Sequence, residues 1–165
     1  MFWNAPAKWR EAQFSLDYHL HRYAVRGRDL KALADDVAQK IIALDPAMDA
    51  LCSQTCPGCQ DPCCGRATVR YDFRDLLFLH LNGRGLPVGQ LETGDGRACF
   101  CLGKNGCLVD RLLRPFMCTW YLCPGQAALL RTEPWQGYDL PERLREVQKD
   151  RKELETGFLA LVGPY

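Results

Sequence analysis

The strongest chemical signal in this sequence is a set of ten cysteines, all of which lie between residues 52 and 123. They fall into two groups, on either side of the cysteine-free stretch 65–98. The first group comprises Cys52, Cys56, Cys59, Cys63 and Cys64, and the second comprises Cys99, Cys101, Cys107, Cys118 and Cys123. Thiolate sulfur is polarisable and negatively charged, so cysteines at such short spacings are typical ligands of soft or borderline metals. We therefore predict that the two groups meet in space and bind a metal ion or cluster, with every cysteine except Cys101 a candidate ligand.

Local patterns around the cysteines bear on the metal and its surroundings. The sequence from Cys56 to Cys59, CPGC, is a turn that brings two sulfurs together and resembles a zinc-knuckle turn. Cys123 is followed by Pro124, an ending common at ligands of iron–sulfur clusters. All-cysteine ligation fits both four-coordinate zinc and a 4Fe–4S cluster; we favour the 4Fe–4S cluster and keep zinc as the alternative. Arg114, four residues before Cys118, is either a cation beside the thiolates or a surface side chain.

The overall composition is that of an ordinary folded protein and excludes several classes of function. The chain has 165 residues, 47% of them hydrophobic and 25% charged, with a net charge of +1. This length predicts one domain over residues 1–165, with the cluster region at about 52–124. Because the charge is close to zero and no run of about 18 apolar residues occurs, neither nucleic-acid binding nor a membrane span is expected. The first residues lack the pattern of a signal peptide, so we expect a cytoplasmic protein, in which clustered thiols bind metal more often than they form disulfides.

Helical periodicity is clearest towards the two ends of the chain. The spacing of apolar residues predicts a helix that begins after Asp29 and ends at Asp45-Pro46, where proline removes a backbone donor. A second long helix is predicted from Asp139, with Glu142 three residues later as in a capping box, to Gly163. Residues 1–27 are rich in aromatic side chains, but their spacing fits a strand as well as a helix.

Between these two helices we predict shorter elements joined by loops. In chain order they are a strand over residues 67–73, a helix over 74–82 that ends at Gly83, and a glycine-rich loop over 83–96 with one strand at 86–91. A hairpin over 98–109 and a turn or short helix over 110–118 follow. The hairpin follows from the motif GKNG at residues 103–106, because Asn-Gly accepts positive φ. The predicted fold class is α-rich α+β, with helices at both ends around an irregular, loop-dominated metal centre and a small β-hairpin.

The order of the cysteines also resembles a known family. Residues 52–124 contain C-x2-C-x3-CC, then Cys99 and Cys107 eight residues apart, then Arg-Pro-x-x-Cys ending at Cys118, and finally Cys123. This order is similar to the YkgJ-type cysteine-cluster family, described as zinc- or iron-chelating, and so implies a metal-binding cysteine centre. The family has two residues rather than three before the paired cysteines, so the resemblance does not decide between residues 63 and 64 as the ligand, and it has no counterpart for those at 52 and 101. The stretch 59–72 also resembles flagellin lysine methylases, much longer proteins with a related cluster region.

Other patterns in the sequence are weaker. Residues 52–59 have the cysteine spacing of the radical S-adenosylmethionine motif, but the chain lacks the alternating strands and helices of a partial barrel. His19 and His21 could form part of a metal site, yet without acidic partners they are more often surface or half-buried groups, and His80 is expected at the edge of the core. We therefore predict a metal-binding module that is structural, electron-carrying or redox-sensing. The alternative is an enzyme related to the cluster-bearing lysine methylases, whose metal would keep an open coordination position.

Overall fold

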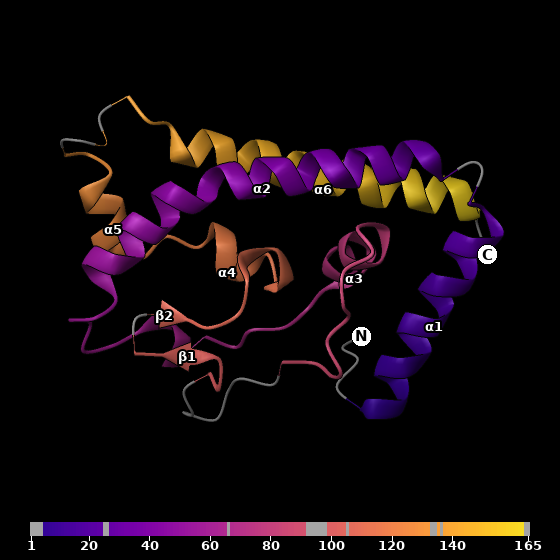
Figure 1. Cartoon of the computed structure of the whole chain (residues 1–165), viewed down its shortest axis with the longest axis horizontal. Helices are drawn as coiled ribbons and strands as arrows, with labels where there is room; N and C mark the ends of the chain where they lie inside the picture. The colour runs from indigo at the N-terminus through magenta and orange to yellow at the C-terminus, as the bar shows by residue number, and fades with distance from the viewer. Residues whose placement is uncertain are drawn as a thin grey trace.

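The computed structural model describes residues 5–24, 27–65, 67–91, 99–104, 106–132, 135 and 137–163. Long helices near both ends of the chain enclose shorter elements and one small hairpin (Figure 1). In chain order the elements are α1 (Pro6–Arg22), α2 (Arg28–Thr55), the 3-10 helix η1 (Cys63–Gly65), α3 (Phe73–Leu81), β1 (Leu102–Gly103), β2 (Gly106–Cys107), the 3-10 helix η2 (Arg111–Leu113), α4 (Met117–Trp120), α5 (Pro124–Leu129) and α6 (Leu140–Val162). The predicted α-rich α+β fold class is therefore confirmed.

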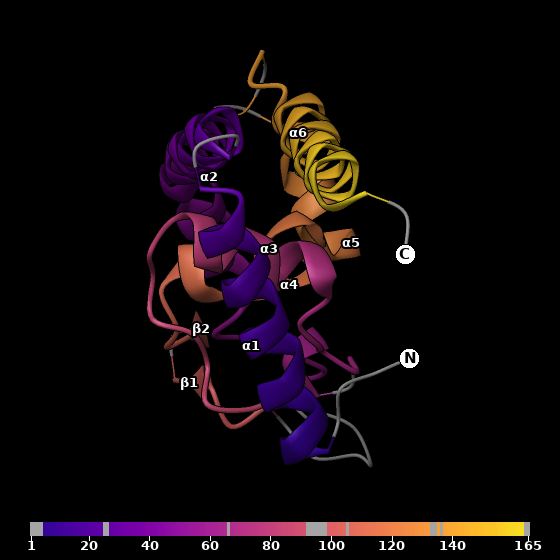
Figure 2. The ribbon, with the colours of Figure 1, turned by 90° about the vertical axis from the view of Figure 1, so that its right-hand side faces the viewer.

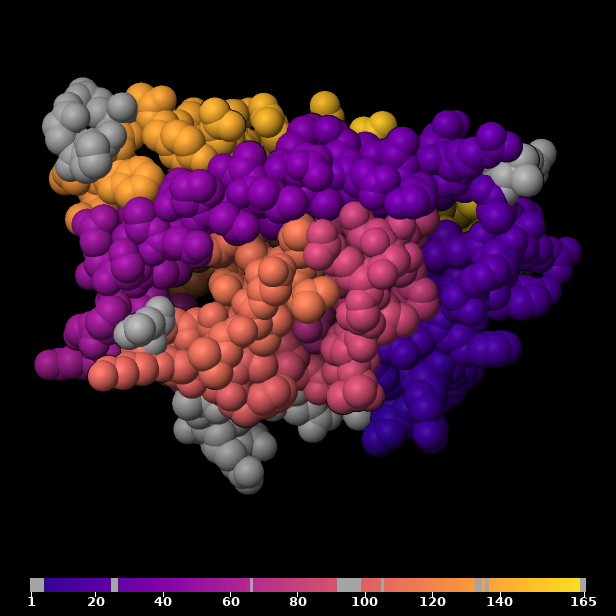
Figure 3. Space-filling view, viewed as in Figure 1, coloured from indigo at the N-terminus to yellow at the C-terminus, as the bar shows by residue number. Residues whose placement is uncertain are grey.

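The two longest helices, α2 and α6, lie side by side and antiparallel along one edge of the molecule (Figures 1 and 2). Lys40 on α2 donates to Asp150 on α6 at 2.6 Å. Nearer the start of α2, Leu30 meets Gly157, where an added Cβ would come within 2.6 Å of the leucine Cδ2. Glycine therefore permits the close approach of the two helices at this point. In Figure 3 this edge runs along the top, above the chain segments that carry most of the cysteines.

Helix α3 lies at the centre of the hydrophobic core. Residues 76–79 are all buried, because α3 contacts α1, α2 and α6 on different sides. A capping box fixes its start: Asp72 accepts from the backbone N–H of Asp75, and Asp75 accepts from that of Asp72. The Asp75 carboxylate also accepts from Arg151 at 2.6 Å and from the backbone N–H of Phe116 at 2.9 Å. These bonds connect α3 to α6 and to the segment that leads into α4.

The predicted end of the first long helix at Asp45-Pro46 is wrong, because α2 continues through Pro46 to Thr55. Proline lacks the N–H that would donate to the carbonyl of Ile42, but that residue is 41% exposed and water can bind there instead. Asp45 and Asp49, on either side of the proline, both bind the guanidinium of Arg111 in η2. Arg111 therefore connects the parts of the helix before and after Pro46. Figure 1 shows that α2 changes direction in its C-terminal half, as an internal proline favours.

Both predicted strands before the hairpin are also wrong. Within the described part of the chain, residues 67–72 and 86–91 belong to no strand, and Phe73 already begins α3. The side chain of Gln90 takes the place of a neighbouring strand for Tyr71. Its Oε1 accepts from the backbone N–H of Tyr71 at 2.6 Å, and its Nε2 donates to the carbonyl of the same residue at 3.0 Å. The end of the predicted loop, residues 92–96, lies outside the described residues.

The remaining predicted elements are present. The aromatic N-terminal segment forms helix α1, whose Trp9 is buried and donates to the carbonyl of Pro87 at 3.0 Å. The hairpin is confirmed but is short, with Leu102 opposite Cys107; Asn105 of its turn lies outside the described residues. The segment 110–118 contains η2 and the start of α4, and Asp139 is the N-cap of α6, as the predicted helix start requires. Among the described residues, no helix combines the length and the apolar character needed to cross a membrane.

Candidate metal centre

Cysteines from both sequence groups meet where α2 ends and α5 begins. Gln126, in the first turn of α5, is buried, and its Nε2 donates to Sγ of Cys52 at 3.5 Å. Its backbone N–H donates to Sγ of Cys123 at 3.5 Å, and its Oε1 accepts from the backbone N–H of Cys123 at 3.2 Å. The backbone N–H of Cys56, the C-cap residue of α2, donates to the carbonyl of Cys52 at 2.8 Å. Two thiols therefore contact one buried amide side chain, and a third cysteine lies one helical turn from the first.

Helix α5 and Gln126 are features that the sequence analysis missed. Cys123 is the N-cap of α5, Pro124 is in its first turn, and Gln126 completes a capping box. The Cys-Pro pair, interpreted from sequence as the end of a cluster motif, is thus also the start of a helix. A capping residue followed by proline and then by glutamine at the third helical position was the signal that could have revealed it.

A second set of thiols lies around the hairpin. The backbone N–H of Cys99 donates to the carbonyl of Cys64 at 2.8 Å, which joins the first sequence group to the second. The pairing of Leu102 with Cys107 returns the chain towards Cys99. The thiol of Cys118, in α4, interacts electrostatically with those of Cys107 and Cys99, and the thiol of Cys64 interacts with those of Cys107 and Cys118.

The prediction that the two sequence groups meet in space is confirmed at both places. The other cysteines differ in their surroundings. Cys63 precedes Cys64 in η1 and forms a hydrogen bond with its thiol, whereas Cys101 is buried in the hydrophobic core beside Cys99. Cys59 is exposed at the end of the CPGC turn, which its backbone N–H closes by donating to the carbonyl of Cys56 at 3.2 Å. None of these ten cysteines is joined in a disulfide.

Two arginines lie beside the thiols. Arg114 donates from Nε to the carbonyl of Val109 at 2.7 Å and interacts electrostatically with both Cys52 and Cys118. Arg114 is therefore a cation next to the thiols, and its half-buried side chain is hydrogen-bonded to the chain just after strand β2. Arg111 is buried, binds two aspartates of α2, and also interacts with Cys52.

Burial and mutual repulsion keep several thiols protonated. Burial raises the pKa of Cys118 to about 12, and the neighbouring thiols of Cys107 and Cys99 act in the same direction. Burial also raises the pKa of Cys52 to about 11, whereas the nearby arginines lower it. The pKa of Cys64 is raised first by its hydrogen bond with Cys63 and then by burial. Several of these thiols can ionise together only if a cation compensates their charge, and a bound metal supplies that charge.

The donor set fits a thiophilic metal centre, although the side chains do not form a ready coordination shell. In the part of the chain that the structure describes, no group of three or more His, Cys, Asp or Glu residues is arranged so that it could hold a metal ion. Sulfur-only donor sets bind zinc and iron–sulfur clusters in preference to hard cations such as Mg²⁺ and Ca²⁺.

The histidines lie on other parts of the molecule. His19 and His21 are near the end of α1, and His21 is mostly exposed, with its Nδ1 3.4 Å from the carboxylate of Asp17 on its own helix. His80 is half-buried on α3, and its Nε2 is buried without a hydrogen-bond partner. Burial lowers the pKa of His80, which favours the neutral ring.

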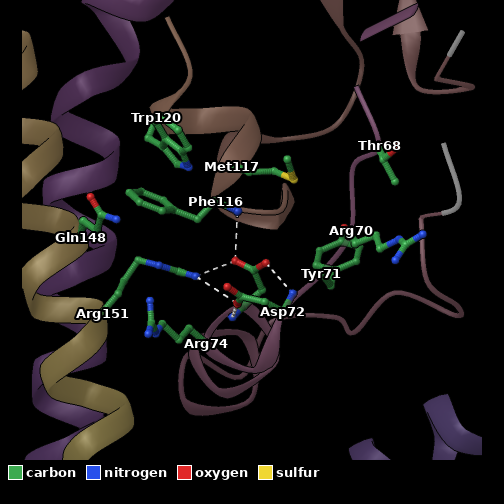
Figure 4. Close-up of a pocket in the computed structure, with 11 residues that line it drawn as sticks. Thr68, Arg70, Tyr71, Asp72, Arg74, Phe116, Met117, Trp120, Gln148 and Arg151 are labelled. Carbon is green, nitrogen blue, oxygen red and sulfur yellow. Dashed lines mark hydrogen bonds and ion pairs between the residues drawn. The ribbon is translucent and has the colours of Figure 1, made fainter. Parts of the chain in front are cut away.

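A cavity of about 400 Å³ lies among side chains of α3, α4, α6 and the segment before α3, and its described lining contains no cysteine (Figure 4). Phe116, Met117 and Trp120 form one wall, and Met117 directly precedes Cys118 in α4. Arg151 reaches into the cavity from α6, with its guanidinium 4.5 Å from the centre of the Phe116 ring. Burial raises the pKa of its partner Asp75 to about 6, although Arg151 acts in the opposite direction. The cavity thus combines aromatic walls with a buried ion pair.

Comparisons with protein-family models, with curated proteins and with solved structures gave no match.

Proposed function

We propose that this protein binds a metal centre through its cysteine thiolates and acts as a structural, electron-carrying or redox-sensing module. The observation that carries this proposal is that cysteines from two distant segments lie close together, through the backbone hydrogen bond between Cys99 and Cys64 and the contacts of Gln126 with Sγ of Cys52 and Cys123. Thiols brought together from distant segments serve a metal better than they serve packing, because ionised sulfur needs a compensating charge. The ligands come from the nine cysteines other than Cys101.

A 4Fe–4S cluster is the favoured occupant, and zinc is the alternative. Both accept all-cysteine ligation; a cluster would add electron transfer, whereas zinc would add structural cross-linking alone. The resemblance to the YkgJ-type family supports either metal. The same proposal places the protein in the cytoplasm, where thiols stay reduced and available to metal.

Anaerobic purification followed by metal and sulfide analysis tests the proposal. A brown protein containing iron and acid-labile sulfide is the expected result. A colourless protein with stoichiometric zinc would replace the cluster by zinc and leave thiolate binding intact. A folded protein that takes up neither metal, even after anaerobic reconstitution, would overturn the proposed function.

One observation favours an enzyme as the second candidate function. The cavity between α3, α4 and α6 could hold a small molecule, as an enzyme related to the cluster-bearing lysine methylases requires. A catalytic metal keeps an exchangeable position, whereas a structural one is saturated by protein ligands. Imidazole added to the protein loaded with Co²⁺ should change the visible spectrum only in the catalytic case, so an unchanged spectrum argues for the module.

A further inference from the structure

The cavity between α3, α4 and α6 combines an apolar wall with charged side chains of both signs (Figure 4). Three arginines and two aspartates line it: Arg70, Arg74, Arg151, Asp72 and Asp75. We propose that this cavity binds a free α-amino acid with an apolar side chain, whose ammonium group lies at Asp72 and whose carboxylate lies at Arg74. Such a ligand would bind whether or not the thiols hold metal, so the site is independent of the proposed metal-binding function.

Two of the charged lining residues neutralise each other inside the core. Arg151 and Asp75 are 4% and 5% exposed, and their side chains are joined by an ion pair at 2.6 Å. The Asp75 carboxylate also accepts from the backbone N–H of Phe116 at 2.9 Å, and the guanidinium of Arg151 lies 4.5 Å from the centre of the Phe116 ring. This pair therefore forms the buried base of the cavity, and the more exposed charges are the ones that a ligand can reach.

The Asp72 carboxylate is the acceptor for the ammonium group. Its side chain is 62% exposed, and its Oδ1 accepts from the backbone N–H of Asp75 at 2.8 Å and lies 3.7 Å from Nη2 of Arg151. Since both contacts use Oδ1, Oδ2 can accept a charge-assisted hydrogen bond from a ligand. The capping bond also fixes the direction of the carboxylate before a ligand arrives, which lowers the entropy cost of binding.

Arg74 is the donor for the ligand's carboxylate. It lies in the first turn of α3, is 35% exposed, and donates from Nε to Glu155 at 2.7 Å. A guanidinium has five N–H groups, so this bond holds the side chain in place and leaves most of its donors for a second carboxylate. Asp72 and Arg74 are two residues apart at the same end of α3. They therefore suit a ligand whose opposite charges are close together, as on the α-carbon of an amino acid.

The apolar wall accounts for the side chain of the ligand. Met117 and Trp120 belong to α4, and Trp120 is 47% exposed although it lines a cavity next to the core. An apolar group of the ligand would cover the indole and the thioether and remove their surface from water. The volume of about 400 Å³ is within the range of small-molecule sites.

A ligand with a single charge fits this lining less well. An anion without an ammonium group would meet the exposed carboxylate of Asp72, and a cation without a carboxylate would meet Arg74 and Arg70. Like charges at such short range oppose binding. An amino acid places one charge of each sign in the cavity and avoids both costs.

Calorimetric titration of the purified protein with four matched compounds tests the inference. L-Phenylalanine has all three features, whereas phenethylamine lacks the carboxylate, 3-phenylpropionate lacks the ammonium group and glycine lacks the apolar side chain. L-Phenylalanine should bind at least about tenfold more tightly than each of the others, because each omission removes a charge-assisted hydrogen bond or the burial of apolar surface. Equal binding of phenethylamine or 3-phenylpropionate would overturn the inference, as would no binding of L-phenylalanine, L-leucine or L-methionine.

Variants of the two charged residues locate the binding in this cavity. Asp72→Asn keeps a good N-cap for α3, and Arg74→Gln removes an exposed cation, so both proteins should fold. Each should bind L-phenylalanine about tenfold more weakly. The matched controls are Asp139→Asn, at the N-cap of α6, and Arg145→Gln, on the exposed side of α6, which should bind like the wild-type protein.

Unchanged binding by Asp72→Asn or Arg74→Gln would overturn the inference. Metal analysis of the same samples keeps the two proposals apart. A protein that holds metal but binds no amino acid would overturn the amino-acid site alone, and one that binds L-phenylalanine but takes up no metal would overturn the proposed function alone.

Discussion

Arg151 and Asp75 carry opposite charges inside the hydrophobic core, where their side chains are 4% and 5% exposed. Replacing Arg151 by methionine would keep most of the packing against Phe116 but leave the carboxylate buried without its cation. We expect the free energy of unfolding to fall by about 3–5 kcal/mol, as for other buried pairs that lose one partner. Urea denaturation of the metal-loaded protein measures this change.

Arg145→Met provides the matched control, because Arg145 pairs with Glu142 on the exposed side of the same helix. This variant should change the free energy of unfolding by no more than about 0.5 kcal/mol. Adding Asp75→Asn to the Arg151→Met variant should recover part of the loss, since a neutral amide needs no cation. Equal effects of Arg151→Met and Arg145→Met would show that the buried pair does not stabilise the core.

His80 makes stability depend on pH. In the unfolded chain the imidazole binds a proton near pH 6.5, but burial lowers its pKa in the folded protein, despite the opposing effect of Asp17. As the pH falls below 6.5, the unfolded chain gains a proton that the folded protein does not, so the free energy of unfolding falls by up to about 1.4 kcal/mol per pH unit.

His80→Leu should remove the contribution of His80 to the loss of unfolding free energy in acid and leave the contributions of other groups. Chemical denaturation of both proteins between pH 7.5 and about pH 5.5, at equal metal content, gives the difference between their curves. Because loss of metal in acid affects both proteins alike, that difference reports on His80. Parallel curves would assign the acid sensitivity to other groups.

At the scale of secondary-structure elements, the side chain of Gln90 forms the hydrogen bonds to the segment before α3 that a neighbouring strand would otherwise form. Its amide satisfies both the N–H and the carbonyl of Tyr71, so Gln90→Leu would leave two backbone groups of a buried residue without partners. We expect a loss of about 1–3 kcal/mol in the free energy of unfolding and faster hydrogen exchange at the Tyr71 amide. Gln54→Leu, whose amide bonds only within α2, is the control and should change neither.

The same elements show what the sequence could predict. Local signals sufficed for α3, α6 and the hairpin, since Asp72, Asp139 and the glycines of GKNG act on their own neighbours. The end of α2 was mispredicted because Arg111, far along the chain, binds both sides of Pro46. The strand at 67–73 was mispredicted because a side chain rather than another strand satisfies Tyr71. Contacts between distant residues decided each of these cases.

The candidate site was also predictable only in part. The spacing of the cysteines marked them as candidate ligands and predicted that the two groups meet, because closely spaced thiols indicate metal binding whatever the fold. It did not indicate that Gln126 contacts Cys52 and Cys123 or that the backbones of Cys64 and Cys99 are hydrogen-bonded, since these contacts depend on helix α5 and on the course of the chain near the hairpin. Neither can be derived from the spacing of cysteines alone.

At the scale of the whole molecule, the hydrophobic core and the cysteine segments stabilise different parts of the chain. Helices α2, α3 and α6 contribute most of the fully buried apolar side chains. The described parts of segments 56–65 and 99–123 are mostly loops and short helices, so the proposed metal coordination would offset much of their ordering entropy. Removing metal under anaerobic conditions should therefore raise hydrogen exchange in those two segments while α6 and the first half of α2 remain protected.

Hydrogen-exchange mass spectrometry of the loaded and stripped proteins checks this expectation. Restoring the metal should return both segments to slow exchange. Uniform protection in the two states would mean that the loops hold their shape without metal, and complete loss of protection in α6 would mean that the helical frame depends on it.

Neighbouring thiols have a further consequence for the lifetime of the protein in air. Cys52 and Cys56 lie one helical turn apart, and the thiols of Cys99 and Cys101 also interact. A bound metal would block oxidation of its thiolates, whereas in the metal-free protein molecular oxygen can oxidise two neighbouring thiols to a disulfide, being itself reduced to hydrogen peroxide, so that at least one candidate ligand is lost. Metal loss would then be reversible in a reducing medium and irreversible in air. Two samples of the same protein would therefore differ in metal content according to whether they had been exposed to oxygen after losing metal.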